Sequence, residues 1–163
     1  MVAGKLLVKR ARKNGRVVER RRSPKRGTIL EVFHELIYFT KVFPHPRLTL
    51  ELVLVDVEEW RYPGRGRRRR SRPRDFQVED QKLLAIHDRL LLRTAGDLCA
   101  LIGCDLSVPF DTAELALRMG VDRWMAQRVA YSLREMGAVQ QIAKRGNTRI
   151  YQRAASEHAA RAG

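Results

Sequence analysis

Cysteine is scarce in this sequence, and no run of apolar residues is long enough to cross a membrane. The two cysteines, Cys99 and Cys104, are separated by four residues, and no second pair exists to complete a zinc site. Cys99 lies in an apolar helical run, so we expect a buried free thiol in a reducing compartment. No apolar signal core follows Met1 to Lys5. These absences predict a cytoplasmic protein with no membrane partner.

The motifs that carry most enzyme chemistry are also missing. There is no phosphate-binding glycine loop, no Ser/His/Asp pattern and no H-E-x-x-H pair of metal ligands. We therefore assign no catalytic residue, no metal ligand and no cofactor. The sequence favours a binding protein over an enzyme.

Acidic residues are in short supply relative to basic ones. The 33 Lys and Arg residues exceed the 18 Asp and Glu residues, which gives a net charge of +15 and a pI near 11.0. Such a charge predicts a polyanionic partner. The excess is concentrated, because residues 1–27 carry eleven Lys and Arg and residues 61–74 carry eight Arg. We expect both stretches to be flexible when free and to attach to phosphates without sequence preference.

Charge and turn signals divide the chain into five parts. Residues 1–27 form a basic arm with a hairpin signal at Asn14-Gly15, and residues 28–60 form a small α/β module. An Arg-rich loop over 61–78, a mostly helical domain over 79–153 and a tail over 154–163 follow. Thr28 and Glu31 form the pattern of a capping box at the start of the first helix. From the spacing of apolar residues we expect a helix over 28–37, a strand over 48–57 and helices over 79–92 and 94–102.

The stretch from Pro109 to Arg153 has the most informative pattern. Asp111 or Thr112 can cap a short helix that ends at Gly120, where a tight turn requires the left-handed conformation. A second helix is predicted from Asp122 to Met136, with its apolar side facing the core. This spacing is typical of a helix-turn-helix.

Two short β-prone runs follow the second helix. They span Val139 to Ile142 and Thr148 to Tyr151, and a turn that contains Gly146-Asn147 joins them. A helix-turn-helix followed by a basic hairpin resembles the winged-helix family of nucleic-acid-binding domains, over about the last third of the chain. The resemblance implies DNA contact, although winged helices also serve as protein-interaction modules.

The expected fold class is therefore α+β. A small N-terminal strand-helix-strand module with basic arms is followed by a mostly helical winged-helix domain. The span from Arg22 to Tyr151 is also similar to an uncharacterised bacterial family, through its R-R-S-P-K-R-G segment, its V-F-x-E-L helix and its K-R-G-N turn. That resemblance implies no activity.

The candidate binding residues lie on the second helix, the hairpin and the Arg-rich loop. On the helix, Arg123 and Gln127 can reach base edges, whereas Tyr131 and Arg134 suit sugar and phosphate. Trp124 either contacts DNA or is buried against the preceding helix. The remaining candidates are expected to meet the nucleic-acid backbone, and they are Lys144, Arg145 and Arg149 on the hairpin and Arg67, Arg68, Arg69 and Arg70 in the loop.

The sequence thus predicts a non-enzymatic protein that binds duplex DNA, in transcription control or mobile-element biology. An RNA-binding ribonucleoprotein component is an alternative, because Arg-rich segments also fold on RNA. A protein partner or a homodimer is compatible with the pattern.

A metal-dependent nuclease, or a subunit derived from one, is the other alternative. The predicted strand is followed closely by acids, and Asp56 and Glu58 are the candidate magnesium ligands, with Glu59 beside them. Trp60 and Arg61 follow, so no lysine is at hand to position a scissile phosphate. Pairing of these acids with neighbouring arginines is the simpler interpretation.

Overall fold

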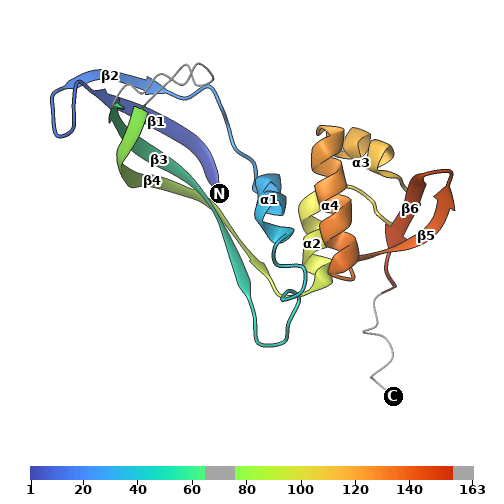
Figure 1. Ribbon diagram of the computed structural model, residues 1–163. Coiled ribbons are helices and arrows are strands. Elements are labelled where there is room, and N and C mark those ends of the chain that lie inside the picture. Colours follow the sequence, from blue (N-terminus) through green and yellow to red (C-terminus); the bar gives the residue numbers. More distant parts are fainter. Residues whose placement is uncertain (65–75, 156–163) are drawn as a thin grey trace. The chain divides into compact units, whose positions relative to one another are not determined.

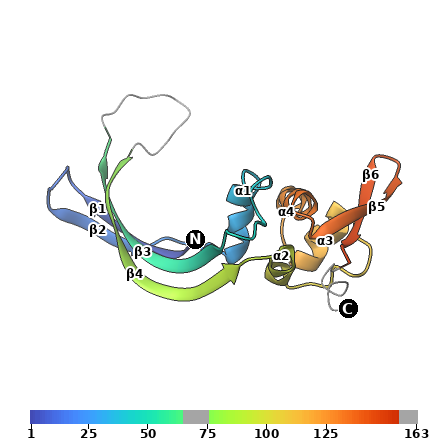
Figure 2. The same cartoon turned by 90° about the horizontal axis from the view of Figure 1, so that it is seen from below.

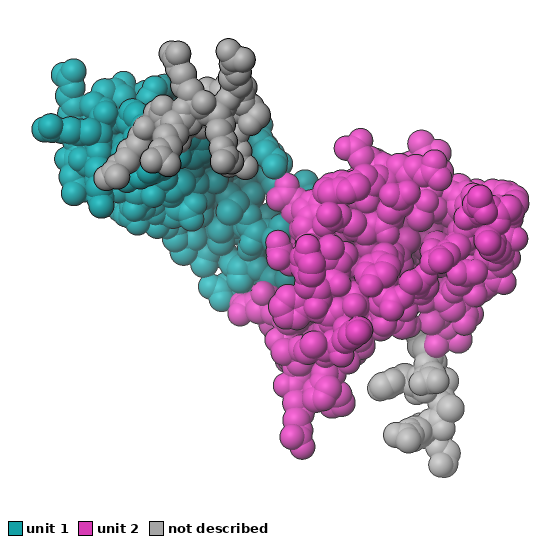
Figure 3. Space-filling view, in the orientation of Figure 1, with its two compact units in different colours: residues 1–29, 52–90 teal, residues 30–51, 91–163 magenta. Residues whose placement is uncertain are grey.

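The computed structural model describes residues 1–64 and 76–155. The chain forms two compact units, coloured separately in Figure 3. Unit 1 comprises Met1–Ile29 and Leu52–Leu90, and unit 2 comprises Leu30–Glu51 and Leu91–Gly163. Each unit is therefore built from two separate stretches of sequence.

Unit 1 is a four-stranded sheet with the strand order β2-β1-β3-β4, shown in Figures 1 and 2. The strands are β1 (Val2–Arg10), β2 (Val17–Arg22), β3 (Leu50–Pro63) and β4 (Phe76–Leu92). β1 pairs antiparallel with β2 and parallel with β3. In the view of Figure 2 the sheet is strongly curved. The described residues of unit 1 form a single layer of strands and contain no α-helix.

The predicted hairpin in the basic arm is confirmed. Asn14 adopts a left-handed φ of 54° in the turn between β1 and β2, and the Ala11 amide donates to the Arg16 carbonyl at 3.0 Å. β1 is an interior strand of the sheet and β2 is an edge strand. Six of the eleven cations of this arm therefore sit on paired strands, namely Lys5, Lys9, Arg10, Arg20, Arg21 and Arg22.

The predicted helix over 79–92 is wrong, because this segment belongs to strand β4. Leu83, Leu84, Ile86, Leu90 and Leu91 satisfy helical spacing, but a short apolar run of this kind does not distinguish a helix from a strand. Backbone pairing with β3 decides the outcome here. Tertiary pairing thus overrides a local periodicity.

Unit 2 holds the helices of the described chain. They are α1 (Phe33–Leu36), preceded by the 3₁₀ turn η1 (Ile29–Val32), then α2 (Ala95–Ile102), α3 (Thr112–Met119) and α4 (Arg123–Glu135). α4 packs against α1, α2 and α3. The largest fully buried apolar side chains of this unit are Phe33, Phe43, Leu92, Leu98, Phe110, Leu115, Val129 and Leu133. They form a continuous apolar core around one side of α4.

The helix predicted over 28–37 occurs as the 3₁₀ turn η1 followed directly by one turn of α-helix, α1. The N-cap of α1 is Val32, which makes no side-chain capping hydrogen bond, and Thr28 precedes η1 instead. The chain then turns at Phe43-Pro44, whose peptide bond is cis. Buried Val32, Phe33 and Leu36 fix α1 by packing, since the helix is too short to be stable from local propensity.

The helix-turn-helix elements and the hairpin are confirmed. Asp111 Oδ1 accepts from the amides of Ala113 and Glu114 at 2.7 and 2.9 Å, and Glu114 Oε2 accepts from the Asp111 amide at 3.0 Å. This capping box starts α3. Gly120 ends it with a left-handed φ of 63°, as the turn requires. β5 (Val139–Arg145) and β6 (Thr148–Arg153) then pair antiparallel around Gly146-Asn147.

The predicted fold class as a whole is wrong. Of the described residues, 43% are in strands and 26% in helices, which does not fit a mostly helical winged-helix domain. The expected strand-helix-strand module is not a unit either, because α1 packs in unit 2 whereas most of β3 lies in unit 1. No helix of the described residues is long and apolar enough to cross a membrane.

Candidate nucleic-acid interface

A cleft of about 420 Å³ lies between α4 and the β5–β6 hairpin. Four of the predicted helix residues line it, namely Arg123, Gln127, Tyr131 and Arg134, and so does Arg149 of the hairpin. The remaining lining residues are Thr112, Asn147, Thr148 and Tyr151. No carboxylate lines the cleft, so its walls present cations, amides and hydroxyls.

The burial pattern of α4 explains why these side chains face the cleft. Val129 and Leu133 are completely buried, and the small residues Ala126 and Ala130 allow close packing of α4 against its neighbours. Arg123, Gln127 and Tyr131 recur every four residues, so they share a face of the helix. All three are exposed. The apolar side of α4 thereby fixes its polar side toward the hairpin.

Arg134 is held in place by its neighbours. Its guanidinium lies 5.7 Å from the centre of the Tyr131 ring, and its Nε donates to Glu135 Oε1 at 2.9 Å. The hydrogen bonds to Glu135 raise the pKa of the Arg134 guanidinium above its ordinary value. Glu135 therefore offsets part of the positive charge of Arg134. Arg123 and Arg149 also line the cleft, and both are exposed to solvent.

The other two hairpin candidates lie outside the cleft. Arg145 lies with its guanidinium 3.5 Å from Asp111 Oδ2, at the start of α3. The hydrogen bond from the Glu114 amide lowers the pKa of the Asp111 carboxyl, and Arg145 adds to that effect against the opposing effect of burial. Lys144 is exposed on β5. Arg145 therefore connects the hairpin to the N-cap residue of α3, and this pairing has no signal in the local sequence.

Trp124 faces α1 and does not line the cleft. Its ring centre is 5.0 Å from that of His34 in α1, and the Arg128 guanidinium lies 4.4 Å from it. The side chain is 55% exposed, so it is neither buried against the preceding helix nor part of the cleft. Arg128 was missed by the sequence reasoning, although its position four residues after Trp124 places it on the same side of a helix.

Thr112, Asn147, Thr148 and Tyr151 line the cleft but are not among the predicted binding residues, and Thr112 is predicted only as a possible helix cap. Asn147 was assigned only a role in the turn, and the two hairpin residues only a role in strand pairing. The predicted Arg67, Arg68, Arg69 and Arg70 lie outside the described residues. Among the described residues, a comparable run of consecutive arginines is Arg20, Arg21 and Arg22, which are all exposed on the edge strand β2.

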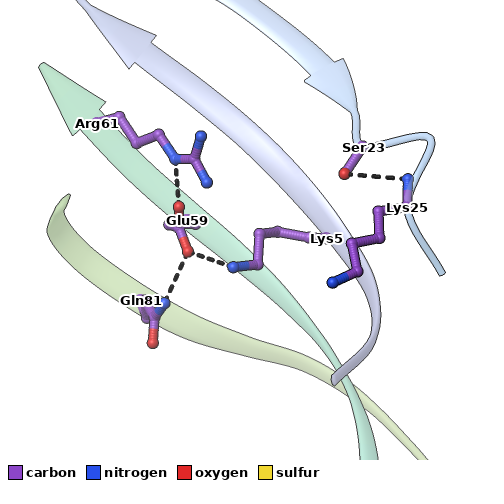
Figure 4. A network of polar contacts seen from close by, with 6 residues as sticks. All are labelled: Lys5, Ser23, Lys25, Glu59, Arg61 and Gln81. Carbon is purple, nitrogen blue, oxygen red and sulfur yellow. Dashed lines mark hydrogen bonds and ion pairs between the residues drawn. The ribbon is translucent and has the colours of Figure 1, made fainter. Parts of the chain in front are cut away.

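The acids of β3 are engaged with basic and aromatic partners. Glu59 is 2% exposed and accepts from Lys5 Nζ at 2.5 Å, from Gln81 Nε2 at 2.8 Å and from Arg61, as Figure 4 shows. Burial raises the pKa of the Glu59 carboxyl, but these hydrogen bonds outweigh it, and the pKa lies below its ordinary value. Glu59 is therefore the charged centre of a network within the sheet.

The two candidate magnesium ligands, Glu58 and Asp56, also contact basic or aromatic side chains. Glu58 accepts from Arg20 at 3.0 Å and from the indole of Trp60 at 3.1 Å. Asp56 Oδ2 lies 3.1 Å from Nε2 of His87. Among the described residues, no three His, Cys, Asp or Glu side chains are placed to hold a metal ion together. The acids of β3 thus face partners of β1, β2 and β4 instead of one another.

Comparison with known proteins gives a family but no activity. No solved structure matches the chain. An uncharacterized protein of Treponema pallidum (strain Nichols) is 28% identical over 154 residues, which cover 93% of this chain and 59% of that protein. The chain thus spans about three-fifths of the length of this relative. Residues 1–93, which include the sheet of unit 1, match the family described as "Domain of unknown function (DUF8091)", and the chain belongs to this family.

Proposed function

We propose that this protein binds duplex DNA, without catalysis, through the cleft between α4 and the β5–β6 hairpin. The observation that carries the proposal is the lining of this cleft. Three arginines, a glutamine and a tyrosine converge from two elements, and no carboxylate opposes them. Guanidinium groups present planar sets of donors that match phosphate oxygens and the edge of guanine.

The residues of the cleft divide by their position. Arg123 and Gln127 lie in the first half of α4, where a helix placed in the major groove brings side chains to base edges. Arg can donate to guanine, and Gln can pair with adenine. Tyr131, Arg134 and Arg149 line the same cleft, and their side chains suit sugar and phosphate oxygens. Exposed Lys144 can contact phosphates, whereas the ion pair with Asp111 already offsets part of the charge of Arg145.

The cations of the N-terminal sheet add an attraction without sequence choice. Arg20, Arg21 and Arg22 are consecutive and exposed on β2, and Glu58 and Glu19 offset part of their charge. Paired strands hold such cations at fixed spacing, so counterion release from phosphates needs little ordering of the chain.

Fluorescence anisotropy tests the proposal on duplex DNA, single-stranded DNA and structured RNA over a series of salt concentrations. After selection of a preferred duplex, we expect Arg123→Ala or Gln127→Ala to weaken binding by about 1–3 kcal/mol and to relax discrimination at one or two base pairs. Arg149→Ala should weaken binding to all sequences alike. Arg47→Ala is the matched control, since Arg47 is an exposed arginine of unit 2 outside the cleft.

Three outcomes would contradict the proposal. If the Arg123 and Gln127 variants keep both affinity and preference, the cleft does not read DNA and is better explained as a protein-docking surface. Stronger binding to structured RNA at every salt concentration would favour a ribonucleoprotein component. Magnesium-dependent cleavage that Asp56→Asn or Glu58→Gln abolishes would establish a nuclease instead.

A further inference from the structure

The strand β4 leaves one long edge of the sheet in unit 1 without a neighbouring strand among the described residues. It spans 17 residues, and every residue from Gln81 to Arg89 is exposed. An edge strand presents a row of backbone N–H and C=O groups that can pair with another strand. The edge is therefore chemically able to extend the sheet.

The side chains of this edge are unusually apolar for a solvent-facing strand. Leu83, Leu84 and Ile86 are 59%, 52% and 43% exposed. Natural edge strands are commonly blunted by short length, by proline or by like charges, and β4 is long and contains no proline. The opposite edge, β2, does carry like charges, because Arg20, Arg21 and Arg22 would repel one another across a self-paired edge. β4 is the edge suited to pairing.

The sequence of β4 is complementary to itself in one antiparallel register. With a two-fold axis at the small residue Ala85, Leu84 lies opposite Ile86 of a second copy, and Lys82 lies opposite Asp88. Each of these pairs occurs twice by symmetry, so two apolar pairs are flanked by two pairs of opposite charge. Cross-strand pairs of both kinds stabilise a sheet.

The neighbouring registers are poorer. An axis at Leu84 places Asp80 opposite Asp88, which brings like charges together. An axis at Ile86 places Leu84 opposite Asp88 and Lys82 opposite Leu90, so neither the apolar pairs nor the pairs of opposite charge form. The pattern of β4 therefore selects the register with its axis at Ala85.

We infer that two copies of this chain associate through antiparallel pairing of their β4 edges about Ala85, which joins two four-stranded sheets into one. This association does not depend on nucleic acid. It satisfies backbone groups of both edges and removes Leu84 and Ile86 of each copy from water.

Sedimentation velocity of the full chain, freed of nucleic acid, tests this inference over a range of protein concentrations. We expect a reversible dimer. Lys82→Asp and Asp88→Lys should each weaken the dimer about tenfold or more, since each creates two pairs of like charge. The double variant Lys82→Asp, Asp88→Lys should recover the parent association, because the opposite charges again face each other in reversed order.

Controls separate the interface from other effects. Lys82 Nζ also lies 5.4 Å from the Trp60 ring, so Lys82→Asp alone could change the sheet itself. The Asp88→Lys variant keeps this contact, and the double variant loses it, so recovery of the dimer in the double variant would show that loss of the contact does not weaken association. Circular dichroism should show the same strand content in all three variants. Lys25→Asp, an equal charge change at an exposed residue outside β4, should leave the dimer unchanged. A parent chain that stays monomeric at all concentrations, or a double variant that remains as weak as the single variants, would overturn the inference.

Discussion

In unit 2 the fully buried side chains are almost all apolar, whereas in unit 1 the buried side chains of the described residues are Val8, Leu52, Glu58 and Glu59. Helices and a hairpin enclose an apolar core in unit 2, whereas the described residues of unit 1 form one curved sheet in which two of the four buried side chains are carboxylates. Unit 1 therefore depends on strand pairing and on ion pairs such as Lys5 with Glu59. The two units should respond differently to mutation, acid and salt.

The protein contains one probe of each unit, because it has two tryptophans, Trp60 in β3 and Trp124 in α4. Replacing one of them by Phe leaves fluorescence that reports on the other unit. Urea unfolding followed in each single-tryptophan background can thus assign a loss of stability to one unit.

The largest expected effect is in unit 2. Val129 is completely buried on α4, so Val129→Asp places an unpaired charge in the apolar core, at a cost of about 5 kcal/mol or more. Trp124 fluorescence and near-ultraviolet circular dichroism should show a unit that is unfolded without urea. A native Trp124 signal in this variant would show that the core of unit 2 is not decisive for its stability.

In unit 1 the corresponding sensitive residue is a carboxylate. Glu59→Gln keeps the shape of the side chain but leaves Lys5 and Arg61 without their counter-charge, and we expect a loss of about 1–3 kcal/mol, limited because both cations are about a quarter exposed. The midpoint in urea should fall for the Trp60 signal. The control is Glu135→Gln on the surface of unit 2, and an equal effect of both changes would contradict the comparison.

The pH dependence follows from the same carboxyl group. The pKa of Glu59 in the folded state is below its ordinary value of about 4.5, so the unfolded chain binds the proton more readily. The stability that this group contributes is fully present above that ordinary value and is lost as pH falls through the lower, folded-state value. We expect the Trp60 midpoint to decline in this acidic range in the parent chain and to decline less in Glu59→Gln. Parallel pH profiles would show that Glu59 is not the group responsible.

The smallest effect should come from an exposed ion pair of the same sheet. Arg21 and Glu19 are paired at 3.2 Å, but both side chains are about half exposed. Water and salt screen such a pair, so Arg21→Ala should change stability by less than about 0.5 kcal/mol in urea unfolding. A loss as large as that of Glu59→Gln would mean that exposure does not separate the two kinds of ion pair.

The parts of the fold that the sequence predicts well are those set by local chemistry. The helix cap predicted at Asp111 or Thr112, the left-handed glycine at 120 and the turn at Asn14-Gly15 depend on neighbouring residues; the structure has the cap at Asp111 and contains the other two features. These signals require no knowledge of distant segments, because each turn or cap is satisfied within a few residues.

The parts that were not predicted depend on pairing between distant segments. The sequence predicts a helix in place of β4 because the register of β4 with β3 cannot be read from periodicity, and no local signal indicates the parallel pairing of β1 with β3. The cleft was predicted in part, since the helical spacing of Arg123, Gln127 and Tyr131 is local, but the partners of Trp124 and Arg145 are not.

The base of the hairpin is fixed to the segment that precedes α3. The amide of Phe110 donates to the Tyr151 carbonyl at 2.9 Å, and the amide of Tyr151 donates to the Phe110 carbonyl at 2.8 Å. Both side chains are buried, and their ring centres lie 6.0 Å apart. The wall of the cleft that carries Arg149 is therefore set before any partner arrives. A partner of this cleft would meet a preorganised surface, and little conformational entropy would be lost when it binds.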